Sequence, residues 1–245
     1  MEARKPIAGN TATGWLKILA LAFMFCDHAG KMLFPGVAEM RMLGRIAFPL
    51  YCWCMVVGAH YTRSFPKYIL RLVIIGLVSQ PLYMLGLAHT WKEPNIFLTL
   101  ALALCGLWGM REKKLLSHIW APALALIASV WLRCDYGWRG VLLVVLLYMA
   151  RDSRGGIAAV MTAFCLFWGS GSGAVRDFFG IPLDVLPSPF SVLTTPWLRL
   201  QALAILSLPL MLIRFKKDLR MPAWVGYELY PGHLIVLIVL IYFFK

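Results

Sequence analysis

The sequence predicts an all-α fold, a polytopic bundle of transmembrane helices formed by one domain that spans residues 1–245. Hydrophobic residues make up 61% of the chain and charged residues 14%, whereas a soluble domain averages about 45–50% and about 25%. The apolar residues come in repeated long runs, which is typical of helices that cross a bilayer. We therefore expect a multi-pass protein of the plasma membrane, with the lipid bilayer as a partner.

Nine apolar segments predict the transmembrane helices, within a range of eight to ten, because several are shorter than the roughly 20 residues that a span needs. The first lacks a small-residue cleavage site, so we expect a retained signal anchor and not a cleaved signal peptide. The Gly- and Pro-rich stretch 171–195 predicts a loop, with a re-entrant segment as an alternative. The segments, with boundaries good to about four residues, are 14–34, 41–61, 67–89, 94–110, 116–133, 136–150, 155–170, 196–215 and 224–244.

The distribution of Lys and Arg predicts that the N-terminus is cytoplasmic. Alternate loops are rich in these residues and nearly free of acids, which marks the cytoplasmic side, and nine crossings then put the C-terminus outside. The net charge of +13 is explained by this topology, so we expect no nucleic-acid partner. The cytoplasmic set is Arg4, Lys5, Arg63, Lys67, Arg111, Lys113, Lys114, Arg151, Arg154, Arg214, Lys216, Lys217 and Arg220; the outer set is Lys31, Arg41, Lys92, Arg133, Arg176 and Lys245, mixed with acids.

The six cysteines predict no metal site. They lie singly or as one Cys-x-Cys, mostly inside apolar runs, and none has the ligand spacing of a zinc site. We expect free thiols in the protein core.

The first apolar segment carries three ionisable side chains, Lys17, Asp27 and His28. A charged group costs at least about 2.5–3.5 kcal/mol at the centre of a membrane helix, so it is retained where it is paired or used. Lys17 and His28 are almost three whole helical turns apart, so both lie on one face, roughly 16 Å apart along the axis. Asp27 lies about 100° around the helix from His28 and needs a cation from another helix.

Depth in the bilayer follows from the topology, at about 1.5 Å per residue. Arg45, on the second helix, lies at the depth of Asp27 and is its predicted partner. Arg71, on the third helix, lies at the depth of Lys17 near the cytoplasmic face. The outer-to-middle level also holds Gln80, Asn95, Asp135, Tyr136, Arg139, Tyr230 and His233.

Two polar clusters result from these depths. The inner one, formed by Lys17 and Arg71 with Arg63 and Lys67, is basic and suits a phosphate-bearing ligand. The outer one places His28 among charged neighbours, which suits a general base because the pKa of histidine lies near working pH.

Structural alternatives stay open for these residues. Lys17 and Arg71 would also serve as interface anchors, and Asp27 with Arg45 as a purely structural ion pair. His233 would also serve as a structural hydrogen bonder. Tyr136, Arg139 and Tyr230 would also serve as packing or interface residues.

The order of these residues resembles the TraX family over nearly the whole chain. The most specific pieces are Asp27-His28 and the block Gly-Arg-Ile-Ala-Phe-Pro at 44–49. The spacing of Lys17 and His28 is also similar to that in membrane acyltransferases that O-acetylate surface polysaccharides. The remaining matches, in the same order, are Arg71, Asn95-Ile96-Phe97, Tyr136-Gly137 and Tyr230-Pro231-Gly232-His233-Leu234.

The resemblance implies an integral-membrane acetyltransferase that takes acetyl-CoA from the cytoplasmic side. The founding member of the family N-acetylates conjugative pilin. Catalytic roles are implied for His28, Asp27 and Arg45, and donor binding for Lys17 and Arg71. Weaker expectations are substrate or oxyanion roles, which fall on Asn95, Tyr136, Arg139, Tyr230 and His233.

We therefore expect transfer of acetyl from cytoplasmic acetyl-CoA to an amine or hydroxyl of a membrane-associated or extracytoplasmic acceptor, with His28 as general base. The acceptor would be a peptide, a glycan or a small molecule. The alternative is a proton-coupled small-molecule transporter, because such carriers also contain buried charges, helix prolines and a midplane histidine. The hydropathy pattern has no two-fold repeat and the charge concentrates at one basic mouth, which favours the enzyme.

Overall fold

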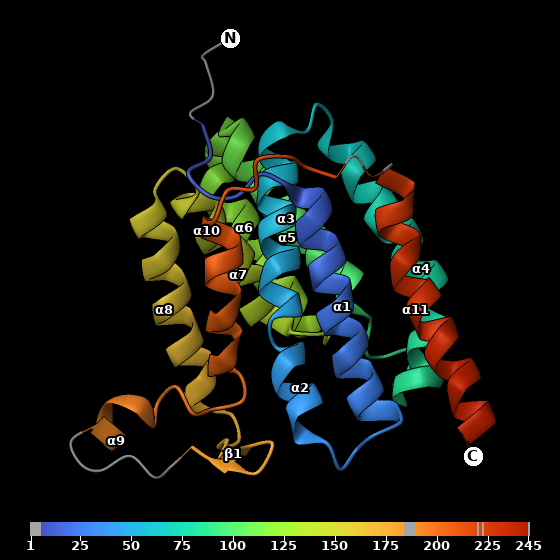
Figure 1. Cartoon of the computed structure of the whole chain (residues 1–245). Coiled ribbons are helices and arrows are strands. Elements are labelled where there is room, and N and C mark those ends of the chain that lie inside the picture. The colour runs from blue at the N-terminus through green and yellow to red at the C-terminus, as the bar shows by residue number, and fades with distance from the viewer. Residues whose placement is uncertain (1–5, 184–189, 220, 222, 245) are drawn as a thin grey trace.

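Long α-helices dominate the structure, a computed structural model that describes residues 6–183, 190–219, 221 and 223–244. In Figure 1, α1 begins at the upper end of the bundle and α11 ends at the lower end. The helices are α1 Thr13–Met32, α2 Ala38–Gly44, α3 Ala47–Tyr61, α4 Phe65–Leu87, α5 Ile96–Glu112, the 3₁₀ turn Lys114–Leu116, α6 Ser117–Trp131, α7 Gly137–Ala150, α8 Arg154–Ser170, α9 Phe190–Thr194, the 3₁₀ helix Ala202–Ser207, α10 Leu208–Leu212 and α11 Ala223–Phe244.

Helix α3 forms the centre of the bundle. Its residues are apolar on every side, and Leu50, Trp53 and Val56 are fully buried. A helix that is hydrophobic all round is stable only when neighbours cover it, and α1, α5 and α7 pack against α3. Helix α11 packs against α1 and α4 on the other side of α1 (Figure 1).

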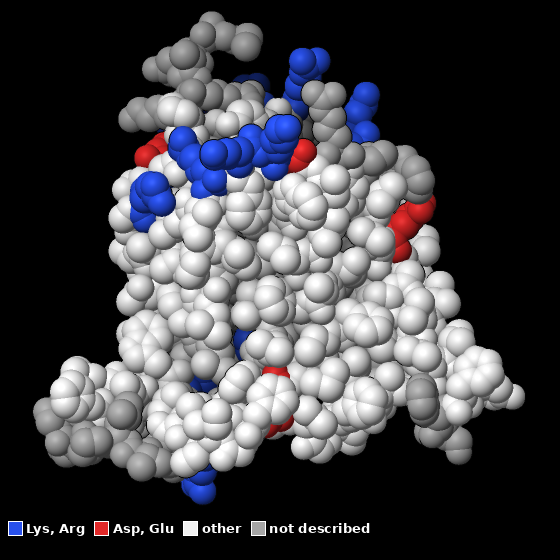
Figure 2. All heavy atoms as spheres, viewed as in Figure 1, with Lys and Arg blue, Asp and Glu red and all other residues white. Residues whose placement is uncertain are grey.

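The flanks of the bundle have the character of a lipid-facing surface. Leu77 and Leu85 of α4 and Ile127 and Trp131 of α6 expose more than half of their surface, which water would penalise but hydrocarbon would not. Figure 2 shows a broad band without charged side chains below an upper end where Lys and Arg gather. This face therefore has the layout of a membrane protein.

Three helical stretches of the described chain are long and apolar enough to cross a membrane. They are Ala38–Tyr61, Phe65–Leu87 and Lys114–Trp131, and shorter apolar helices cover Gly137–Ala150, Ala202–Leu212 and Glu228–Phe243. The largely helical fold is thus confirmed, and three stretches fit membrane spans, while the count of nine crossings and the cytoplasmic N-terminus stay predictions.

The predicted helix 41–61 is interrupted between Gly44 and Ala47. Pro49 lies in the first turn of α3, where it has no amide proton to donate to the carbonyl of Arg45. The chain therefore begins a new helix at Ala47, and the turn leaves Arg45 at the junction of α2 and α3.

The predictions for 171–195 and 196–215 were partly wrong. The first stretch is not only loop, because Asp177–Phe178 (β1) pairs antiparallel with Ile181–Pro182 (β2) and α9 follows. The second is helical only over Ala202–Leu212. The amide of Leu200 donates to the carbonyl of Gly173, and that of Val175 to the carbonyl of Leu198, so this backbone pairs with a neighbouring loop in place of forming a helix.

Candidate active site

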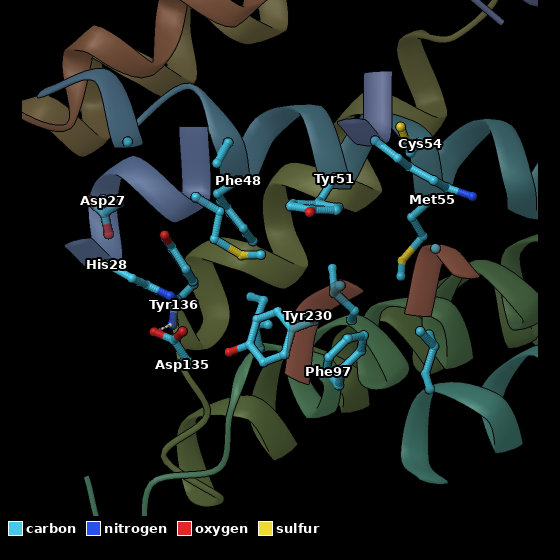
Figure 3. A pocket seen from close by; sticks show the side chains of 18 of the residues that line it. Asp27, His28, Phe48, Tyr51, Cys54, Met55, Phe97, Asp135, Tyr136 and Tyr230 are labelled. Carbon is cyan, nitrogen blue, oxygen red and sulfur yellow. Dashed lines mark hydrogen bonds between the residues drawn. The ribbon is translucent and has the colours of Figure 1, made fainter. Parts of the chain in front are cut away.

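Helix α1 lines one continuous cavity with both Lys17 and His28, as their helical spacing predicts. This central cavity has a volume of about 100 Å³, and Figure 3 shows its side chains converging from several helices. Its walls are mostly apolar and aromatic. Besides Lys17 and His28, they include Met24, Asp27, Phe48, Tyr51, Cys54, Met55, Leu72, Phe97, Asp135, Tyr136 and Tyr230.

Asp27 forms the predicted ion pair with Arg45, which is confirmed: Nη2 of Arg45 donates to Oδ1 of Asp27. Both side chains are nearly buried, with 12% of Asp27 and 7% of Arg45 exposed. The prediction missed Arg41, whose Nη1 lies 3.1 Å from Oδ2 of Asp27. Arg41 is one helical turn before Arg45, and this i, i+4 spacing was the available signal.

The close approach of α1 and α2 makes this arrangement possible. A Cβ atom on Gly44 would overlap the carboxylate of Asp27, and one on Gly30 would lie 2.7 Å from Cβ of Met40. Only glycine at 44 lets the backbone come this near to the ion pair. Steric exclusion by Asp27 thus explains why the Gly-Arg block has a glycine at position 44.

His28 is hydrogen-bonded to His233 of α11, with 2.8 Å between Nδ1 of His28 and Nε2 of His233. Nδ1 of His233 lies 3.3 Å from the carbonyl oxygen of Leu229, which only accepts. The network therefore assigns the proton of His233 to Nδ1, so its Nε2 accepts from Nδ1–H of His28. Nε2 of His28 is then the unprotonated nitrogen, and no residue of the described chain donates a hydrogen bond to it.

An inner cavity of about 420 Å³ opens at the end of the bundle where α1 begins. Lys17 and Tyr68 line both this cavity and the central one. The predicted inner cluster is thus brought together, and the lining contains no Asp or Glu of the described chain. The other lining residues are Gly58, Tyr61, Thr62, Arg63, Ser64, Lys67 and Arg71.

An outer cavity of about 400 Å³ adjoins the central cavity at its other end. Asp27, His28, Asp135 and Tyr136 line both. Three cavities that share side chains therefore follow α1 from one end of the bundle to the other, with His28 at the junction of the last two. The remaining outer lining residues are Lys31, Arg41, Arg45, Tyr83, Leu87, His89, Cys134, Gly137, Trp138, Arg139, Trp168 and Gln201.

Tyr136 and Asp135 enter the cavities from the turn between α6 and α7. Tyr136 has a φ of +61°, which a non-glycine residue rarely adopts, and its ring stacks on Phe48 at 3.8 Å. Such backbone strain is common at functional sites. Asp135 was absent from the predicted site residues. Burial raises the pKa of its carboxyl group to about 6, although the amide of Tyr136 donates to it.

The other predicted residues divide into two groups. Tyr230 lines the central cavity with its ring 5.2 Å from that of His233, and Arg139 lies at the outer cavity above Trp138. Asn95 is buried elsewhere. Its Oδ1 accepts from the amide of Phe97 and its Nδ2 donates to the carbonyl of Gly76. Its oxyanion role stays a prediction, but its amide already caps α5.

Comparisons with known proteins agree with the resemblance. The family model described as TraX protein matches residues 12–241. The probable fimbrial assembly protein FimC, serogroup H1, of Dichelobacter nodosus is 27% identical over 54% of this chain and 59% of its own length. The uncharacterized protein RP591 of Rickettsia prowazekii (strain Madrid E) is 28% identical over 57% of this chain and 56% of its own. The chain thus spans somewhat over half of the length of these curated relatives, and no solved structure matches it. Because the family model covers almost the entire sequence, the chain belongs to the TraX family.

Proposed function

We propose that this protein is an integral-membrane acetyltransferase that transfers acetyl from acetyl-CoA to an amine or hydroxyl of an acceptor. The single observation that carries the proposal is the row of three cavities that share side chains along α1, with His28 lining both the central and the outer one. A donor that enters at one end and an acceptor that enters at the other would meet at Nε2 of His28.

The inner cavity would hold the phosphates of acetyl-CoA. Lys17, Arg63, Lys67 and Arg71 line it without a carboxylate among the described residues, and clustered cations are the usual recognition of phosphate groups. The pantetheine arm would extend past Lys17 along the apolar wall of the central cavity toward His28. The thioester would then lie beside the base.

The reaction would be direct acyl transfer. Nε2 of His28 takes the proton from the acceptor, whose nitrogen or oxygen attacks the thioester carbonyl, and the C–S bond breaks. The thiolate of CoA then takes the proton back from His28. Nε2 of His233 accepts the Nδ1 proton of His28 and would stabilise the transient imidazolium, the role that a carboxylate has in hydrolase triads. Tyr136 and Arg45 are the candidate oxyanion donors.

The relative named as a fimbrial assembly protein suggests pilus-subunit peptides as the first acceptors to test. The purified full-length protein should be stabilised thermally by acetyl-CoA but not by a short acetyl thioester without the nucleotide. With acceptor present, it should release CoA. His28→Ala should retain the thermal stabilisation and lose the release of CoA. The proposal would be contradicted if acetyl-CoA neither stabilised the protein thermally nor served as a donor for acetylation of the acceptor.

The same cavities would also suit a proton-coupled carrier, the alternative that the sequence leaves open. In proteoliposomes, a carrier would move solute and protons together without releasing CoA. An acetyltransferase would release CoA on the donor side whether or not a proton gradient is present.

A further inference from the structure

We infer that the outer cavity binds an anionic group, a phosphate or a carboxylate, that the acceptor carries next to its nucleophile. This inference rests on the proposed function and adds the class of substrate. Four cations line the outer cavity, namely Lys31, Arg41, Arg45 and Arg139, against the two carboxylates of Asp27 and Asp135. The cavity therefore has an excess of positive charge.

The two carboxylates form no ion pair with Lys31 or Arg139 in the described chain. Asp27 is shared between Arg41 and Arg45. Nζ of Lys31 lies 3.3 Å from Nε2 of His89, whose Nδ1 lies 3.4 Å from a carboxylate oxygen of Glu93. The guanidinium of Arg139 lies over the ring of Trp138, 5.1 Å from its centre. Within the described chain neither side chain forms an ion pair. Two cations thus line the cavity outside any ion pair of the described chain.

The position of these cations needs an explanation other than membrane topology. Lys and Arg concentrate at the cytoplasmic ends of membrane proteins, and in this molecule they gather at the upper end in Figure 2, where α1 begins. The outer cavity lies toward the other end of α1. A group of cations there runs against the topology preference, and binding of an anion supplies a reason for it.

The place of the anion fits the reaction. His28 lines the outer cavity together with Lys31, Arg41 and Arg139, so an anion held by these cations would place a neighbouring amine or hydroxyl beside the base. The side chain of Arg41 is 34% exposed although it contacts Asp27, and a guanidinium has five N–H donors, so it retains donors for a second oxygen ligand. Charged hydrogen bonds of this kind give specificity for an anionic over a neutral acceptor.

Binding without acetyl-CoA tests this inference independently of turnover. Calorimetry on the full-length protein in nanodiscs of phosphatidylcholine would compare glucosamine 6-phosphate with glucosamine, and glucuronate with glucose. The anionic member of each pair should bind at least about tenfold more tightly, because one charge-assisted hydrogen bond accounts for about that factor. Equal affinities within both pairs would overturn the inference while leaving acetyl transfer intact.

Variants locate the site. Lys31→Gln and Arg139→Gln should each remove most of the preference, whereas Lys92→Gln, an exposed cation outside the lining, should retain it. If Arg71→Gln loses the preference for the anionic ligand while Lys31→Gln and Arg139→Gln keep it, the anion binds in the inner cavity and the inference is overturned.

A second experiment adds phosphatidylglycerol to the nanodiscs and distinguishes the two sources of the anion. If phosphatidylglycerol weakens binding of the soluble anion, and this weakening is absent in Lys31→Gln, the anion is a lipid-linked headgroup. If phosphatidylglycerol leaves the binding unchanged, the anion belongs to a soluble acceptor.

Discussion

The two ends of α1 differ in how they hold charge. Near its start, Lys17 lines a cavity with other cations, of which Arg63, Lys67 and Arg71 are exposed, and no carboxylate of the described chain lines it. Near its end, Asp27 and His28 each contact a partner from another helix within 3.1 Å. Exposed side chains of like charge can change conformation to suit a soluble polyanion. Buried side chains that are hydrogen-bonded to neighbouring helices are held in one geometry. The first arrangement suits donor binding and the second suits chemistry.

The strongest test of the comparison removes the proposed base. His28→Ala should lower acetyl transfer about 10²–10⁴-fold, the usual contribution of a general base, with little loss of stability because Leu229 still holds His233. Turnover and detergent melting temperature should be measured on the same sample. His118→Ala, an exposed histidine on α6, is the matched control and should keep full activity. Substantial turnover in a folded His28→Ala protein would end the role of this residue.

The buried network should also be the more stabilising of the two ends. Asp27→Asn should cost about 3–5 kcal/mol, because it leaves the buried guanidinium of Arg45 without its counter-ion. Arg45→Ala should cost less, because Arg41 still pairs with Asp27. Chemical or thermal unfolding in detergent would measure this cost. In a double-mutant cycle the two changes should be strongly coupled, and additive effects would show that the pair contributes no interaction energy.

A steric test isolates the packing around this pair. Gly44→Ala should destabilise the protein by about 1–3 kcal/mol, as overpacking does, because the new methyl group would overlap the carboxylate of Asp27. Gly36→Ala is the control, since no atom lies within 4 Å of a Cβ there. Equal melting temperatures for the two variants would mean that α1 and α2 separate easily and that the ion pair is not held rigidly.

The inner end should show the smallest effects, confined to the donor. Lys17→Gln should raise the KM for acetyl-CoA about tenfold, as loss of one charged hydrogen bond does. Arg71→Gln should raise it about threefold, because solvent weakens an exposed cation. The KM for the acceptor should not change. A short thioester donor without the nucleotide should be affected less by either variant.

Accessibility gives a second test of the inner end and of the topology. Lys17→Cys in a protein without native cysteines should react with a membrane-impermeant thiol reagent only from the cytoplasmic side, and acetyl-CoA should protect it. Labelling from the outer side would refute the predicted orientation and favour the transporter.

Local pattern was enough for the helices and for part of the site. The apolar runs predicted α1, α4, α5, α6, α7, α8 and α11 to within about four residues. Helical periodicity predicted that Lys17 and His28 share one face of a helix, and both line the central cavity. Counting residues from the assumed faces of the bilayer was enough to pair Asp27 with Arg45, because depth is an approximately linear function of position in a membrane helix. Where a proline or a loop pairing competes with the helix, at 45–46 and 196–201, the same pattern failed.

By itself, then, the sequence determined the largely helical, membrane-like class and most of the helices, because these depend on composition and periodicity along the chain. Only the tertiary structure decided that His28 bonds to His233, which is 205 residues away. It also decided that Arg41 shares Asp27, that Asn95 caps a helix, and that three cavities along α1 share lining side chains. Rotation and neighbour order of helices at one depth are set by side-chain packing between distant segments, and hydropathy along a single chain carries no information about that packing.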